Sequence, residues 1–155
     1  MPTIPADPFN LERFVVAQSG IYQDALRELR AGEKRSHWMW FVFPQASGLG
    51  SSSMTQKYAI ASRAEAAAYL GHAVLGRRLE ECAAALLAVK GRSAEQIMGY
   101  PDNLKLKSSM TLFAEVSSDN SLFSSVLLKY FQGGKDARTL ELLAKDQPRP
   151  AGPGS

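Results

Sequence analysis

The spacing of the apolar residues limits the fold of this 155-residue chain more than any other feature of its sequence. From residue 54 to residue 144, hydrophobic side chains recur every three or four positions, which is the period of one face of an α-helix. The clearest stripes are Leu75, Leu79, Cys82, Ala83 and Leu86, and Leu122, Phe123, Val126, Leu127, Tyr130 and Phe131. This pattern predicts an all-α protein.

Residues that start helices separate these stripes into short pieces. Ser62 followed by Glu65, and Ser93 followed by Gln96, each fit a capping box at the start of a helix. Asp7-Pro8 is typical of another start, with Asp at the N-cap and Pro at the first helical position. Pieces of this length predict seven or eight short helices.

The length and the ends of the sequence indicate one helical domain between two loose ends. A chain of this size fits one domain, and we place that compact single domain at residues 7–144. Residues 1–6 are expected to form a flexible leader. Residues 145–155 form a Pro/Gly-rich tail, and a composition of that kind predicts disorder.

The composition excludes several classes of protein. Hydrophobic residues make up 45% of the chain and charged residues 21%, and no apolar run approaches the ~20 residues that span a membrane. Cys82 is the one cysteine, which excludes an internal disulfide and a zinc site built from cysteines. Because the start of the chain has no apolar export signal, we expect a reducing, cytoplasmic location.

Neither a nucleic acid nor a metal ion is indicated as a partner. The chain has 18 Lys+Arg against 15 Asp+Glu, a net charge of +3, and its positive residues are scattered rather than gathered into a basic stripe. The two histidines, His37 and His72, have no carboxylates at ligand spacing around them. We therefore predict no metal and no cofactor, and we expect His72 to act as a local cap or core contact.

The segment 36–45, with the sequence Ser-His-Trp-Met-Trp-Phe-Val-Phe-Pro-Gln, is the most unusual stretch of the chain. Nearly every residue in it is apolar, so periodicity leaves open whether it is a strand or a helical turn. Trp38 and Trp40 point in nearly opposite directions in either geometry, so at most one of them faces the core. The segment is either a core segment with polar ends or an aromatic wall for a planar ligand.

A second group of polar residues falls within the segment 100–111, which contains the start of a predicted helix. Asp102 is placed to cap this helix, and Lys105 follows one turn later, where the two side chains can pair. Ser108 and Ser109 lie one further turn along the chain. These residues form either a polar groove suited to phosphate or ribose hydroxyls, or a capped helix whose serines pack as small interface residues.

The two segments together predict a site for a small nucleotide-like or phosphate-bearing ligand between residues 34–45 and 102–109. The ligand-binding candidates are Lys34, Ser36, Trp38, Trp40, Gln45, Lys105, Ser108 and Ser109. A reaction on such a ligand would use Asp102 and His37 as acid and base, with a tryptophan stacked on the nucleobase. The alternative is a non-catalytic protein-interaction module that presents residues 36–45 to a partner.

Four segments carry a more specific signal, namely Lys34–Gln45, Tyr58–Ile60, His72–Leu79 and Asp102–Phe113. Together they resemble the bacterial domain of unknown function 1810 family, whose motif Ser-His-Trp-Met-Trp-Phe-x-Phe-Pro-Gln is found in the first segment. Some members of that family carry the name calpastatin, which says nothing about activity. The resemblance implies an all-α, monomeric or weakly associating domain, similar in fold to a mycobacterial protein of unassigned activity. It implies no established function.

Two positions depart from the usual pattern of that family, Ala73 where a proline is common and Asn103 where an aspartate is common. Because Asn103 replaces the usual aspartate, this chain lacks a carboxylate at a position where other members of the family have one. The helix Asp102–Phe113 also resembles, more loosely, one in a helical family that hydrolyses N-glycosidic bonds of ADP-ribose-type and riboflavin-precursor substrates. That likeness implies hydrolysis of the N-glycosidase type, with Asp102 and His37 as the acid and the base.

Overall fold

Ten α-helices form the fold of the computed structural model, which describes residues 6–117 and 121–146. They are α1 (Glu12–Gln18), α2 (Tyr22–Ala31), α3 (Met39–Val42), α4 (Ser53–Lys57), α5 (Arg63–Gly71), α6 (Leu75–Ala88), α7 (Ala94–Met98), α8 (Asp102–Val116), α9 (Leu122–Phe131) and α10 (Ala137–Lys145). The all-α prediction is confirmed. The helices outnumber the seven or eight expected because α3 and α4 have only four and five residues, too few for a helical period to register.

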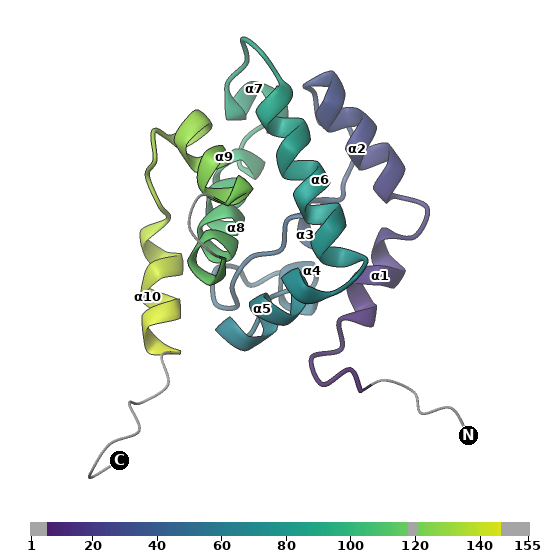
Figure 1. Ribbon diagram of the computed structural model, residues 1–155, viewed down its shortest axis with the longest axis vertical. Helices are drawn as coiled ribbons and strands as arrows, with labels where there is room; N and C mark the ends of the chain where they lie inside the picture. The colour runs from purple at the N-terminus through teal and green to yellow at the C-terminus, as the bar shows by residue number, and fades with distance from the viewer. Residues whose placement is uncertain (1–5, 118–120, 147–155) are drawn as a thin grey trace.

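Two long helices, α6 and α8, form the centre of the packing. Helix α6 contacts α2, α5 and α9, while α8 contacts α5, α7, α9 and α10. Within α8, every residue from Leu106 to Phe113 except Lys107 is buried. Figure 1 shows α1 and α2 on one side of the molecule and α10 on the other, with α6 and α8 between them. One hydrophobic cluster connects these helices.

The aromatic segment 36–45 is a core segment that contains a helical turn, so the open question between strand and helix is resolved for the helix. Its buried residues are Trp38, Met39, Phe41, Val42, Phe43 and Pro44. Trp38 is fully buried, whereas Trp40 is half-buried, as expected from their opposite directions. The segment therefore presents no continuous aromatic face to a partner protein.

The helix starts agree with the sequence in part. At α7 both halves of the capping box are present, because Ser93 Oγ accepts the Gln96 N–H and the Gln96 side chain accepts the Ser93 N–H. At α5, Ser62 Oγ accepts the Glu65 N–H, but the Glu65 carboxylate accepts the N–H of Ala61 instead. Glu65 is buried, and its Oε1 accepts the Ala61 N–H, so its Oε2 is available to a different partner.

Helix α1 begins later than the sequence indicated. Pro8 was expected at the first helical position, but residues 8–11 form turns and the helix starts at Glu12. The Asp7 carboxylate still caps it, by accepting the backbone N–H groups of Leu11 (2.8 Å) and Glu12 (3.0 Å). Asn10, in the left-handed region at φ 51°, turns the chain between the cap and the helix.

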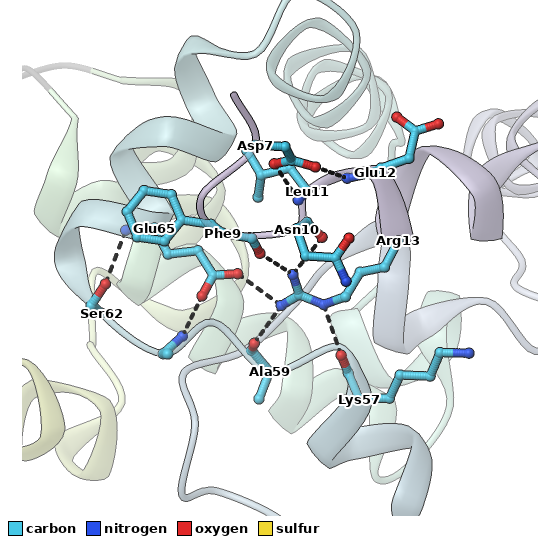
Figure 2. A network of polar contacts seen from close by, with 11 residues as sticks. Asp7, Phe9, Asn10, Leu11, Glu12, Arg13, Lys57, Ala59, Ser62 and Glu65 are labelled. Atoms are coloured by element: carbon cyan, nitrogen blue, oxygen red, sulfur yellow. Dashed lines mark hydrogen bonds and ion pairs between the residues drawn. The ribbon is translucent and has the colours of Figure 1, made fainter. Parts of the chain in front are cut away.

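The guanidinium of Arg13 is the hub of a polar network that joins the start of the chain to α4 and α5 (Figure 2). It donates to the backbone carbonyls of Phe9, Asn10, Lys57 and Ala59. It also pairs with the Glu65 carboxylate at 2.7 Å, where the two side chains are 15% and 4% exposed. A nearly buried charge pair of this kind holds α1 against the loop between α4 and α5.

The last helix runs past the predicted end of the domain at residue 144. Helix α10 ends at Lys145, one residue beyond the predicted domain limit. The leader and the tail fall mostly on residues 1–5 and 147–155, which lie outside the described part of the chain. Among the ten helices given above, none combines the length and the apolar character that crossing a membrane requires.

Replacing Glu65 tests the importance of this network for stability. Glu65→Ala leaves the Arg13 guanidinium without its counter-charge, so we expect the free energy of unfolding to fall by about 3 kcal/mol. Glu141→Ala is the matched control, because Glu141 pairs with Arg138 on the surface at 62% exposure and should cost about 0.5 kcal/mol or less. Urea unfolding at pH 7 measures both, and equal losses in the two variants would contradict a structural role for the network.

Candidate functional site

The carboxylate of Glu28, on α2, holds the loop that leads into the aromatic segment. Its Oε1 accepts the backbone N–H groups of Arg35 (2.7 Å) and Ser36 (3.0 Å) and the indole N–H of Trp38 (2.9 Å). Its Oε2 accepts the Ser36 hydroxyl at 2.6 Å. The indole nitrogen of a fully buried tryptophan needs a partner of this kind, so Glu28 fixes both the loop and the direction of Trp38.

These hydrogen bonds change the acidity of Glu28. Burial by itself raises the pKa of the carboxyl, but the hydrogen bonds from Ser36, Arg35 and Trp38 together outweigh it and lower the pKa from 4.5 to about 2. The folded protein therefore keeps Glu28 ionised throughout the neutral and mildly acidic range. Ser36 and Trp38, both predicted ligand contacts, are engaged with Glu28 rather than with open solvent.

Both the backbone and the side chain of Lys34, in the same loop, are held by polar contacts. Its backbone N–H donates to the carbonyl of Ile97 at 2.7 Å, and its Nζ donates to the Ser36 carbonyl at 2.6 Å. The ammonium also lies 3.0 Å from Asp102 Oδ2 and 5.0 Å from the centre of the Trp38 ring, with 7% of the side chain exposed. Lys34 thus forms an ion pair with Asp102, and this pair connects the loop to the start of α8.

Asp102 lies between two ammonium groups. Its Oδ2 faces Lys34, and its Oδ1 lies 3.6 Å from Lys105 Nζ, so the predicted pairing of Asp102 with Lys105 is confirmed. The prediction that Asp102 caps the helix is wrong, because α8 begins at Asp102 and no side chain caps that end. Lys105 is 30% exposed and its Nζ lies 5.9 Å from the centre of the Trp40 ring. Two cations therefore share one carboxylate.

A groove of about 330 Å³ opens beside Lys105. It is lined by Gln45, Leu49, Gly50, Thr55, Pro101, Leu104, Lys105, Lys107, Ser108 and Asp136. One wall is the first half of α8, and the other is the loop that runs from Gln45 to α4. None of the ion pairs within the described residues uses Lys107. The groove is therefore flanked by one shared and one unshared ammonium group.

Backbone contacts fix the loop that forms the second wall. The Gln45 carbonyl accepts the Ile60 N–H at 2.9 Å, and the Ser47 N–H donates to the Ile60 carbonyl at 2.8 Å. At the other end, a Cβ on Gly50 would lie 2.6 Å from Thr55 Cγ2, so only glycine fits without moving Thr55. The groove therefore has two walls that are set by contacts elsewhere in the fold.

The predicted site residues divide into three groups. Gln45, Lys105 and Ser108 line the groove. The second group is absent from the groove lining and consists of buried or partly buried residues, namely Lys34, Ser36, Trp38, Trp40, Asp102 and Ser109. His37 is exposed and is absent from the groove lining, so the structure does not bring it together with Asp102 in that groove.

Three polar residues of the groove were missed by the sequence analysis. Lys107 lies within the predicted segment, and its spacing of two from Lys105 gave no reason to place both on one groove. Thr55 and Asp136 lie on α4 and just before α10, far from α8 in the sequence. Asp136 caps α10, because its Oδ2 accepts the N–H and the hydroxyl of Thr139. Only tertiary packing brings these residues together.

Another cavity, of about 610 Å³, lies at the start of α1. It is lined by Ala6, Asp7, Pro8, Phe9, Leu11, Glu12, Ala68 and His72. His72 Nδ1 accepts the N–H groups of Val74 and Leu75, which confirms its predicted role as a local cap. The lining holds two carboxylates and neither lysine nor arginine, so its charge disfavours a phosphate group.

Metal binding and thiol chemistry receive no support from the geometry. Within the described residues, no three His, Cys, Asp or Glu side chains gather closely enough to hold a metal ion. Burial raises the pKa of the Cys82 thiol to about 12. The thiol is therefore un-ionised near neutral pH and is a packing group of α6.

Comparison with known proteins agrees with the fold. A family model described as a protein of unknown function (DUF1810) matches residues 8–143. The crystal structure at 1.38 Å of the conserved hypothetical protein Rv1873 from Mycobacterium tuberculosis is 56% identical, with a TM-score of 0.88, over 89% of this chain and 99% of that one. None of the curated proteins matches. The resemblance seen in the sequence is thereby confirmed.

The lowered pKa of Glu28 allows a test of how much its hydrogen bonds to the loop stabilise the fold. Glu28→Gln replaces an acceptor of four hydrogen bonds, so we expect the free energy of unfolding at pH 7 to fall by about 2 kcal/mol. Because the folded pKa lies near 2 and the ordinary value is 4.5, this stabilisation is complete above pH 4.5 and is lost as the pH falls toward 2. The gap between the wild type and the variant should therefore narrow on acidification.

Unfolding in urea at pH 7, 4.5 and 3 measures that gap. Glu80→Gln is the control, since Glu80 is exposed on α6 and its replacement should leave the stability nearly unchanged at each pH. A gap for Glu28→Gln that stays constant from pH 7 to pH 3 would contradict the lowered pKa. A negligible gap at pH 7 would contradict the role of the carboxylate itself.

Proposed function

The chain belongs to the DUF1810 family of proteins of unknown function, and from the geometry of the groove we propose that it binds a small, phosphate-bearing, nucleotide-like ligand there. The observation that carries the proposal is the pair of lysines, Lys105 and Lys107, on the lining of one 330 Å³ groove. A volume of that order is typical of small-molecule sites. The ligand's phosphate would lie beside the two ammonium groups.

The charge around the groove favours an anion. Asp102 is shared between Lys34 and Lys105, so one carboxylate faces two cations. Lys107 adds a second cation on the groove itself, while the Asp136 carboxylate is engaged in capping α10. Attraction between charges is stronger in a partly enclosed groove than in bulk water, and an ammonium group is a common phosphate partner.

Neutral polar groups complete the lining. Gln45 brings amide N–H donors from one wall, and Ser108 and Thr55 bring hydroxyls that can donate or accept. Ser108 Oγ donates to the Leu104 carbonyl at 3.3 Å, which leaves its lone pairs to accept from a ligand hydroxyl. Ribose and phosphate oxygens offer partners for each of these groups.

The proposal covers binding and leaves out the two other roles considered from the sequence. Hydrolysis by Asp102 and His37 is not favoured, because both Asp102 oxygens face ammonium groups and His37 is absent from the groove lining. A protein-interaction role for residues 36–45 is not favoured either, because most of that segment is in the core. The groove is where polar residues of both predicted segments, Gln45, Lys105 and Ser108, line one space.

Ligand-induced stabilisation tests the proposal directly. Inorganic pyrophosphate and AMP should each raise the melting temperature of the wild type, since a ligand at 100 times its dissociation constant adds about 2.7 kcal/mol of stability. Lys105→Ala and Lys107→Ala should each lose most of that shift. Lys90→Ala removes the same charge from an exposed loop after α6 and should keep the whole shift.

Two results would overturn the proposal. The first is a wild-type melting temperature that neither pyrophosphate nor AMP changes at millimolar concentration. The second is a shift that survives in both groove variants, because the anion would then bind elsewhere. Circular dichroism of each variant without ligand shows whether the fold is intact, so that a lost shift reports on binding.

A further inference from the structure

The groove holds a carboxylate as well as two ammonium groups. Asp136, immediately before α10, lines it together with Lys105 and Lys107. Its Oδ2 accepts both the N–H and the hydroxyl of Thr139, while its Oδ1 takes part in none of the hydrogen bonds or ion pairs found among residues 6–117 and 121–146. A carboxylate in a groove for an anion repels the ligand, unless the ligand also offers that carboxylate a hydrogen-bond donor.

Backbone and side-chain contacts place Asp136 close to Lys107. The Asp136 N–H donates to Thr111 Oγ1 at 2.9 Å, and this hydroxyl donates to the Lys107 carbonyl at 2.8 Å. The Lys107 ammonium lies near the same loop, because a Cβ on Gly134 would be 3.7 Å from Lys107 Nζ. Within the part of the chain that the structure describes, no ion pair joins Asp136 to Lys105 or Lys107. The groove therefore offers a ligand both positive charge and an unused anionic acceptor.

The remaining polar residues of the lining suit a polyol better than a flat ring. Gln45, Thr55 and Ser108 carry groups that form hydrogen bonds with hydroxyls, and none of the described residues that line the groove is aromatic. A sugar or glycerol skeleton carries several hydroxyls, and a carboxylate oxygen is a strong acceptor for a hydroxyl proton. Acidic side chains recognise the ribose hydroxyls of dinucleotides in this way.

We infer that the groove takes phosphorylated polyols, with the phosphate beside Lys105 and Lys107 and a hydroxyl of the carbon skeleton donating to Asp136 Oδ1. This inference rests on the proposed function and adds the part of the ligand that is selected. A nucleotide would be held by its ribose phosphate, and its base would contribute little. Asp136 is then a specificity-determining residue, because it attracts a phosphate ester that carries a hydroxyl and repels one that does not.

Glycerol 3-phosphate and n-propyl phosphate separate the hydroxyls from the phosphate. The two compounds share the same carbon chain and the same phosphate, and only the first carries hydroxyls. In calorimetric titrations near neutral pH, we expect the wild type to bind glycerol 3-phosphate about ten-fold more tightly, since a hydrogen bond to a charged group in a partly exposed site contributes a factor of that order.

Asp136→Asn keeps the helix cap and removes the anionic acceptor. Asparagine caps helices about as well as aspartate does, and its one oxygen is needed to accept the Thr139 N–H. The atom left for the ligand is then an amide N–H donor. The preference should fall to about two-fold or less, because a neutral hydrogen bond contributes less than a charged one, and n-propyl phosphate should bind more tightly than it does to the wild type.

Asp24→Asn is the matched control, because it makes the same chemical change on α2, at a side chain that is 48% exposed and does not line the groove. It should keep the ten-fold preference of the wild type. Equal binding of the two compounds by the wild type would overturn the inference, and so would a preference that stays ten-fold in Asp136→Asn.

Inorganic pyrophosphate separates a failure of this inference from a failure of the proposed function. If pyrophosphate binds and glycerol 3-phosphate does not bind at millimolar concentration, the inference is overturned and the phosphate site stands. If none of the three compounds binds, the proposed function is overturned, and this inference with it.

Discussion

The candidate site depends on the hydrogen bonds that the Glu28 carboxylate accepts. This carboxylate accepts four hydrogen bonds from three residues at the start of the aromatic segment. The donors are the N–H groups of Arg35 and Ser36, the Ser36 hydroxyl and the Trp38 indole. A charged acceptor in a partly buried position holds its donors more strongly than a neutral one. With the loop fixed, Lys34 reaches Asp102, and Asp102 in turn lies against Lys105.

The lysines near α8 have different roles because their surroundings differ. Lys34 is 7% exposed and is satisfied by a carboxylate, a carbonyl and an aromatic ring. Lys105 shares the same carboxylate at a longer distance and is 30% exposed, so part of its charge remains available to the groove. Lys107 lines the groove outside this cluster. The positive character of the groove thus comes from Lys107 and from the part of the Lys105 charge that the shared Asp102 does not balance.

The fold could be predicted from local signals, whereas the site could not. Helical period and the Ser93–Gln96 capping box act within a few residues, and the structure confirms both. The partner of Trp38 is ten residues away on another helix, and Thr55 and Asp136 reach the groove only through packing. Residue type and spacing could therefore select Gln45, Lys105 and Ser108 as polar candidates. They could not show that Lys34 would form an ion pair with Asp102 or that Trp38 would be buried.

Mapping of a ligand onto the backbone tests the central claim most directly. Amide resonances of ¹⁵N-labelled protein can be followed by NMR while inorganic pyrophosphate is added to millimolar concentration. The account predicts that the largest shifts fall in residues 45–50 and 101–108, on the two walls of the groove. Shifts concentrated at residues 7–12 and His72, around the cavity with two carboxylates, or no saturable shifts at all, would contradict it.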